Sequence, residues 1–191
     1  MLLPPKNVSR QIGQNVLRVG RQVPLAWAVD GKKLLPHISL LHINTSRIKE
    51  VCRAVRMIAE DCKRLSINFI KPHAGQVYFV AEVKNSRALY ALHRRVVTSI
   101  GRLSQGLVKL PPVGKTALQK KYMREYGVGN VLKYFYPHIT LGGTREKKDL
   151  PMILRLIGKL EFTDFTATRL ALAKVNKHHQ VIKIIKEFKI A

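Results

Sequence analysis

The sequence predicts an α+β fold made of two similar lobes rather than a doubly wound parallel sheet. A Pro-His-Ile-hydroxyl-Leu motif occurs twice, at residues 36–40 and 137–141, and its histidines lie 101 residues apart. Each copy has the alternating polarity of a strand and is followed by an amphipathic helix and then by two further strands. This recurring order indicates a weak internal repeat, and it is the basis for expecting two lobes.

The individual elements follow from the hydrophobic pattern along the chain. A short apolar run at 23–29 and the turn signal Asp30-Gly31 predict a hairpin between that run and the first motif strand, at about 35–42. A connection over 104–132 precedes the second motif, and connections of this length are more often functional than idle. Apolar residues spaced by three or four, and short apolar runs, predict the remaining elements: helices at 48–62, 86–103, 116–126 and 149–158, and strands at 65–70, 76–83, 134–141, 166–175 and 180–188.

The composition indicates a folded protein with a large excess of positive charge. The 191 residues are 46% hydrophobic, enough for a substantial core, and no apolar run approaches the ~20 residues of a membrane span. Lys and Arg number 35 against 11 Asp and Glu, which gives a net charge of +24. An excess of this size favours a polyanionic partner such as RNA. A membrane partner is not expected, because the sequence offers no basic amphipathic anchor helix.

Residues 1–21 are interpreted as a basic N-terminal arm ahead of a single bilobal domain at 22–191. The first acidic residue of the chain is Asp30. Such a segment is typical of an organellar transit peptide and equally of an arm that lies on nucleic acid. Cys52 and Cys62, ten residues apart in one predicted helix, are ~15 Å apart and cannot form a disulfide. Reduced thiols fit an intracellular compartment, either the cytoplasm or, as an alternative, the mitochondrial matrix.

The repeated motif offers a pair of acid–base groups. Side chains alternate along a strand, so His37 and Ser39 share one face, and so do His138 and Thr140. Two imidazoles that titrate near neutrality can act as base and acid in breaking a phosphodiester, without a metal or a cofactor. The two hydroxyls can donate to the non-bridging phosphate oxygens. One copy alone would be weak, since a single strand histidine is usually a core or surface residue; the duplication carries the hypothesis.

These paired motifs resemble the two His-x-Ser/Thr-x signatures of the 2H phosphoesterase superfamily, the group that contains the 2′-5′ RNA ligase-like proteins. The resemblance covers about 23–190 in spacing and element order, although only the two motifs match as sequence. It implies two antiparallel sheets lining a central cleft with helices outside. It also implies metal-independent action on 2′,3′-cyclic phosphates or 2′-5′ bonds in RNA or nucleotides. His37 and His138 would be acid and base, and Ser39 and Thr140 would hold the phosphate.

A second set of candidates interleaves cations and aromatic rings near the second motif. Such mixtures suit single-stranded nucleic acid, although ordinary packing is the alternative for the tyrosines. Together with the net charge, this set keeps a second function open: an RNA-binding structural component of a ribosomal or organellar ribonucleoprotein, built on the same fold. The candidate contacts are Lys121, Tyr122, Arg124, Lys133, Tyr134, Tyr136 and Arg145.

Overall fold

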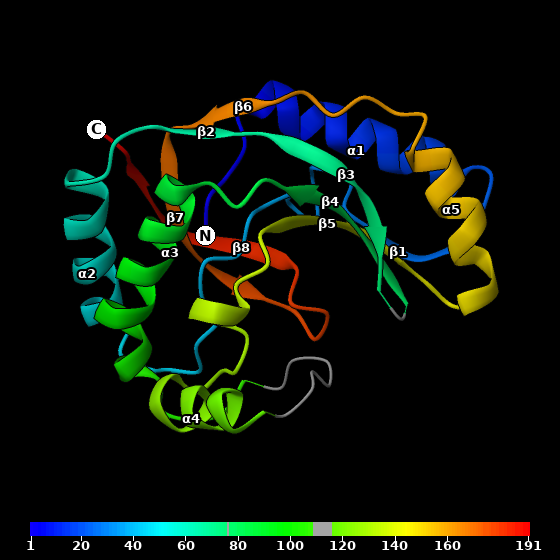
Figure 1. Ribbon diagram of the computed structural model, residues 1–191. Coiled ribbons are helices and arrows are strands. Elements are labelled where there is room, and N and C mark those ends of the chain that lie inside the picture. Colours follow the sequence, from blue (N-terminus) through cyan, green and yellow to red (C-terminus); the bar gives the residue numbers. More distant parts are fainter. Residues whose placement is uncertain (76, 109–115) are drawn as a thin grey trace.

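A computed structural model describes residues 1–75, 77–108 and 116–191, and within them it shows a mixed α/β fold with antiparallel sheets and five α-helices (Figure 1). The elements in chain order are α1 (Lys6–Gly20), β1 (Leu25–Ala28), α2 (Ile48–Glu60), β2 (Leu65–Ile67), β3 (Phe69–Ala74), β4 (Tyr78–Val83), α3 (Arg87–Ile100), η1 (Gly101–Leu103), α4 (Ala117–Tyr126), η2 (Leu132–Tyr134), β5 (His138–Thr144), η3 (Lys147–Asp149), α5 (Leu150–Ile157), β6 (Phe165–Ala167), β7 (Arg169–Val175) and β8 (Val181–Lys189). The four predicted helices are confirmed as α2 to α5. Gln76, the expected start of a strand, lies outside the described residues, and so does 109–115 of the long connection.

The largest sheet has four antiparallel strands in the order β1-β5-β4-β3, and β2-β6 and β7-β8 form two-stranded pairs. The second motif begins β5 and therefore lies inside the sheet, between β1 and β4. The predicted hairpin between 23–29 and 35–42 is wrong, because β1 pairs with β5 instead. Its turn signal forms a local turn, in which the Asp30 carboxylate accepts from the backbone N–H groups of Lys32, Lys33 and Leu34.

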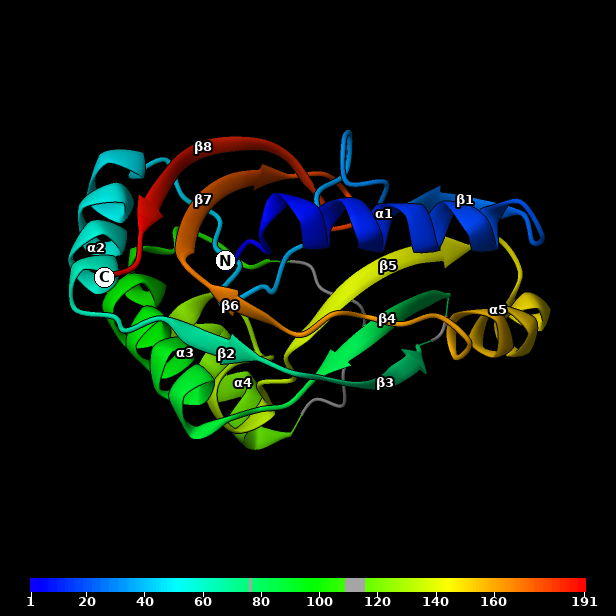
Figure 2. The ribbon, with the colours of Figure 1, turned by 90° about the horizontal axis from the view of Figure 1, so that it is seen from above.

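The first motif is not a regular strand, which corrects the prediction for 35–42. It is held by isolated antiparallel bridges, from Ile38 to Leu2 on one side and to Ile139 on the other, and by a bridge from Leu35 to Val181. Pro36 has no N–H group, so it cannot extend a ladder of hydrogen bonds. Leu2 also bridges to β7, and the N-terminus lies in the middle of the molecule in both views (Figures 1 and 2). These bridges connect the β7-β8 pair to the four-stranded sheet.

The helices pack on the two groups of strands. α1 and α5 contact each other and the four-stranded sheet, whereas α2 contacts β7, β8 and α3 (Figure 2). The aliphatic side chains of both motifs enter the common core as predicted, since Ile38, Leu40, Ile139 and Leu141 are at most 2% exposed. Cys52 and Cys62 are both free. Among the described residues, no helix has the length and apolar character needed to span a membrane.

Residues 1–21 do not form a separate arm, and the structure corrects that expectation. Most of the segment is α1, and its apolar side chains Val8, Ile12, Val16 and Val19 are buried in the same core as the motif isoleucines. Leu2 is fully buried as well. The spacing of these apolar residues by three and four is that of an amphipathic helix. The segment is therefore an integral layer over the sheet.

Strand pairs are exchanged between the two halves of the chain. The predicted strands at 65–70 and 166–175 are each divided by one residue, Asn68 and Thr168, a hundred positions apart. The first pieces, β2 and β6, pair with each other. The strands that follow the first motif, β3 and β4, join the second motif in one sheet, whereas β7 and β8 bridge to the region of the first motif. The two halves are thus interlocked.

Candidate active site at the paired histidine motifs

The fold places the two motifs side by side. Ile38 and Ile139 form an antiparallel bridge, and both side chains are buried. Neighbours in antiparallel pairing alternate between faces, so the residues flanking the bridge share the opposite face. On this alternation His37 is expected to lie across from Thr140, and Ser39 across from His138. The bridge therefore predicts that the four side chains singled out from the sequence share one face of the paired segments.

The two imidazoles are held in the same way. Nδ1 of His37 is 2.9 Å from the carbonyl oxygen of Leu35, and Nδ1 of His138 is 2.8 Å from that of Tyr136. A carbonyl oxygen can only accept, so the hydrogen of each neutral ring is on Nδ1. Nε2 is then the atom that can accept a proton as a base or, once protonated, donate it as an acid. Both rings are thus preset for proton transfer through Nε2.

The environment keeps both histidines neutral. Burial lowers the pKa of His37 to about 4; the hydrogen bond to Leu35 opposes this shift, and the charges of the N-terminus and of His138 add to it. Burial also lowers the pKa of His138, against its hydrogen bond to Tyr136 and with a contribution from His73. A phosphate anion bound between the rings would favour the charged form and raise both pKa values. A protonated imidazole is therefore expected beside a bound phosphate.

Further polar groups reach this face from β3 and β4. Glu82 of β4 pairs with His138 of β5. Val80 of β4 pairs with His73 of β3 on one side and with Thr140 of β5 on the other. The Tyr136 ring is 5.2 Å from that of His138 and 6.4 Å from that of His73. Burial, followed by the nearby Glu82 carboxylate, raises the pKa of Tyr136 to about 12, so its hydroxyl keeps its proton. No local sequence pattern predicts the strand register that brings Glu82 and His73 here.

A third histidine connects the two motif segments. His93 of α3 is fully buried, and its Nδ1 is 2.8 Å from the carbonyl oxygen of Leu40, the last residue of the first motif. The N–H of Leu132 donates to Nε2 at 2.8 Å, and the imidazole stacks on Phe135 with ring centroids 3.8 Å apart. Leu132 and Phe135 lead directly into the second motif. From sequence pattern alone His93 is interpreted as structural or solvent-facing; the structure shows that it is structural and fully buried, with partners in two distant segments.

A comparison with protein families decides where this arrangement belongs. A family model described as the 2′-5′ RNA ligase superfamily matches residues 30–179, which include both motifs and most of the strands. The chain belongs to the 2′-5′ RNA ligase superfamily. Membership points to phosphoesterase or ligase activity and to an RNA-related substrate. A search of curated proteins found no match.

Within the superfamily region, the structure separates the predicted nucleic-acid contacts into two groups. The cations of α4 and η2 are exposed: Lys121, Arg124 and Lys133. The rings of Tyr122 and Tyr134 are half-buried and pack against each other, with their centroids 6.4 Å apart. Tyr136 lies beside His138, as described above. Arg145 follows the seven-residue strand β5, so it lies roughly 24 Å along the strand from His138 at ~3.4 Å per residue. The fold does not bring Arg145 to the paired histidines.

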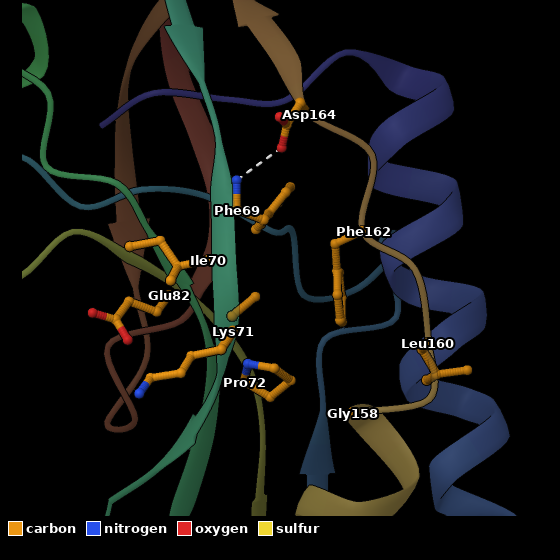
Figure 3. Close-up of a pocket in the computed structure, with 10 residues that line it drawn as sticks. Phe69, Ile70, Lys71, Pro72, Glu82, Gly158, Leu160, Phe162 and Asp164 are labelled. Carbon is orange, nitrogen blue, oxygen red and sulfur yellow. Dashed lines mark hydrogen bonds between the residues drawn. The ribbon is translucent and has the colours of Figure 1, made fainter.

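A pocket of about 350 Å³ lies along β3, the edge strand of the four-stranded sheet, on the side of the segment at 158–164. Phe69 and Phe162 face each other across it, with ring centroids 5.5 Å apart (Figure 3). Of its lining residues, Glu82 also pairs with His138, but neither motif histidine lines the pocket. The pocket is thus adjacent to the candidate site and distinct from it. The described residues contain no cluster of histidine, cysteine and carboxylate side chains suited to a metal ion.

Proposed function

We propose that the protein is a metal-independent phosphoesterase of the 2′-5′ RNA ligase superfamily, acting on 2′,3′-cyclic phosphates or 2′-5′ bonds of RNA or nucleotides. The observation that carries this proposal is the pair of histidines on bridged segments, each held through Nδ1 with Nε2 available. We further propose that the two groups of strands flank one shared cleft, which receives the phosphodiester between His37 and His138.

Hydrolysis of a 2′,3′-cyclic phosphate then needs two proton transfers. One imidazole takes a proton through Nε2 from the attacking water as its oxygen bonds to phosphorus. The other imidazole, protonated in the presence of the phosphate anion, gives its proton to the ribose oxygen as the phosphorus–oxygen bond breaks. The product is a phosphate monoester on the remaining ribose oxygen. The hydroxyls of Ser39 and Thr140 donate to the non-bridging oxygens and stabilise the charge that develops there.

Turnover of defined substrates in EDTA tests this function. A 2′,3′-cyclic mononucleotide, a 2′-5′ dinucleotide and a 3′-5′ dinucleotide would be compared for the wild type, His37→Ala and His138→Ala. Each substitution removes one proton carrier and is expected to lower kcat by roughly 10²–10⁴-fold on the cyclic or 2′-5′ substrate. His178→Ala is the matched control, because this exposed histidine stacks on Trp27 and lies outside both motifs.

The control variant should retain wild-type turnover. Thermal unfolding of all four proteins establishes that the losses are not due to misfolding. If the wild type turns over none of the three substrates faster than His37→Ala and His138→Ala, the proposed function is wrong. Selective turnover of the 3′-5′ dinucleotide would exclude the proposed bond specificity while leaving the two-histidine chemistry in place.

A further inference from the structure

The outward side of α1 carries only positive charge. Lys6, Arg10 and Arg18 of the helix and Arg21 at its C-terminal end are all exposed, and no acidic residue occurs before Asp30. At ~100° per residue these four positions fall within a sector of roughly 120°, opposite the buried apolar stripe. They extend over ~22 Å of helix at ~1.5 Å per residue. Polar neighbours such as Gln14 share this sector, and Leu17 is its exposed apolar residue.

The turn after β1 enlarges this surface. A Cβ atom on Gly13 would be 2.3 Å from the carbonyl oxygen of Asp30, and one on Gly31 would be 2.8 Å from that of Ser9, so the turn lies directly against the helix. The exposed Lys32 and Lys33 are therefore brought beside the N-terminal half of α1. The Asp30 carboxylate accepts three backbone hydrogen bonds within the turn. We define the α1 basic face by its exposed cations: Lys6, Arg10, Arg18, Arg21, Lys32 and Lys33.

The opposite flank of α1 is closed by the chain near 161–163. Asn15 donates to the carbonyl oxygen of Glu161 at 2.9 Å, and Gln11 accepts from the N–H of Thr163 at 3.3 Å. These contacts bring one acidic residue, Glu161, to that flank through its backbone. In the part of the chain that the structure describes, no ion pair involves a residue of the α1 basic face. Its cations are thus available to a partner.

The second long amphipathic helix, α2, shows what an ordinary charged face looks like in this protein. Its exposed cations Lys49, Arg53 and Arg56 alternate with Glu50 and Glu60. Arg47, which precedes the helix, pairs with its acidic first turn, and Asp61, which follows it, pairs with α3. Positive and negative groups are therefore interspersed on α2. Solubility does not explain why all the charged residues of α1 are positive, because a mixture of positive and negative residues keeps a helix soluble equally well.

The chemistry of the partner follows from what α1 lacks as well as from what it presents. Anionic membranes attract basic amphipathic helices, but such a helix inserts its apolar face into the lipid. The apolar face of α1 is already buried against the sheet, as Val8, Ile12 and Val19 are at most 3% exposed. A rigid row of Lys and Arg without an insertable face suits a polyanion that is bound through its phosphates. In a member of an RNA ligase superfamily, that polyanion is RNA.

We infer that the α1 basic face is a second RNA-binding surface, which holds the phosphate backbone of a polynucleotide away from the paired histidines. α1 lies outside the region that matches the superfamily model, residues 30–179, so the match does not account for this surface. It is also on the core side of the four-stranded sheet, because its buried side chains pack with Ile139 and Leu141, whereas His138 and Thr140 face the other way. The surface therefore acts independently of the proposed reaction.

The test compares two triple substitutions that remove equal charge. One is Arg10→Gln, Arg18→Gln and Arg21→Gln on α1, and the other is Lys49→Gln, Arg53→Gln and Arg56→Gln on α2. Binding of a labelled single-stranded RNA would be measured by fluorescence anisotropy between low and moderate KCl. Each lost phosphate contact lowers the slope of log K against log salt by about 0.7 for single strands. The α1 triple should thus lower the slope by about 2 and weaken binding by roughly 10- to 100-fold at ~0.1 M salt.

The α2 triple should keep a slope close to that of the wild type. Equal loss in both triples, or no loss in either, would overturn the inference, since net charge alone or another surface would then account for binding. Sedimentation with phosphatidylserine vesicles is the second arm, and an α1 triple that loses vesicle binding but retains RNA binding would also overturn it. Turnover of a 2′,3′-cyclic mononucleotide should be equal in both triples, and an inactive wild type would refute the proposed reaction without changing the binding result.

Discussion

The hydrogen bonds of His93 lead to a prediction about stability whose size can be worked out. Because Leu40 offers a carbonyl oxygen and Leu132 offers an N–H, the His93 ring is neutral and carries its hydrogen on Nδ1. Leu132 also has a backbone φ of 54°, a conformation that a leucine adopts only when its surroundings hold it. Replacing the imidazole removes both partners at once, in a site with no access to water.

The perturbation is His93→Leu, with His93→Gln as the matched control. Leucine fills the volume but leaves a buried carbonyl and a buried N–H unpaired, at ~1–3 kcal/mol each, so we expect a loss of about 2–6 kcal/mol in the free energy of unfolding. Glutamine can donate to Leu40 and accept from Leu132, and it should lose clearly less. Urea unfolding followed by circular dichroism measures both. Equal losses for leucine and glutamine would mean that the two hydrogen bonds are not what His93 contributes.

The same contacts predict a pH dependence. Burial lowers the pKa of His93 from its ordinary 6.5 to about 4, against the hydrogen bond to Leu40. In the unfolded chain His93 therefore binds a proton below pH 6.5, whereas in the folded protein it binds one only below about pH 4. Stability should be complete above pH 6.5 and decline as the pH falls through this window, by about 3 kcal/mol at ~1.4 kcal/mol per unit. Burial also lowers the pKa of His37 to about 4 and that of His42 to about 3, so both residues add to the loss of stability at low pH. The quantity to measure is therefore the stability of the wild type minus that of His93→Gln, and parallel curves for the two proteins would refute the reasoning.

Three other predictions concern the site and α1. Because the pKa values of His37 and His138 are lowered in the free protein and one ring must be protonated, kcat/KM for a cyclic mononucleotide should peak below pH 6.5 and kcat at higher pH; coincident maxima above pH 7 would contradict this. Tyr136→Phe removes the hydroxyl that hydrogen-bonds to Glu82 beside His138, so it should lower kcat/KM by roughly tenfold without changing Tm; unchanged kinetics would show that this hydroxyl takes no part in the reaction. Gly13→Ala should lower stability by ~1–3 kcal/mol in urea, because its Cβ would meet a backbone oxygen at 2.3 Å, whereas Gly20→Ala, with its nearest contact at 3.4 Å, should not.

The features that could be predicted from the sequence are those that depend on local pattern. Alternation within the two motifs predicted that Ile38 and Ile139 enter the core, and apolar spacing predicted α2 to α5. The segment at 1–21 carried the same kind of signal, with Val8, Ile12 and Val16 four residues apart. The expectation of an arm rests on the positive charge of the segment and not on this spacing. Charge describes the exposed face of a helix and says little about whether the other face is buried.

Other features depend on partners that are distant in the chain. Each bridge of the first motif involves a residue far away in sequence, such as Leu2, Ile139 or Val181, and the motif itself has no ladder to complete. The pairing of Glu82 with His138 is a matter of strand register, which a one-residue shift would reverse. His93 joins Leu40 and Leu132 only because α3 lies between them. Local periodicity contains no information on the bridges of the first motif, on the pairing of Glu82 with His138, or on the partners of His93.

The exchange of strand pairs explains why the two histidines need the whole chain. β4, from the first half, supplies the strand beside His138, and β8, from the second half, supplies the bridge at Leu35 that precedes His37. A fragment containing one motif would therefore lack the strands that hold that motif, and its exposed edges would remain unpaired. The paired β2 and β6 strands fasten the halves together at the point of exchange. The position of His37 relative to His138 is thus set by backbone pairing within a single interlocked fold, so we expect substitutions at the exchange to change activity and stability together.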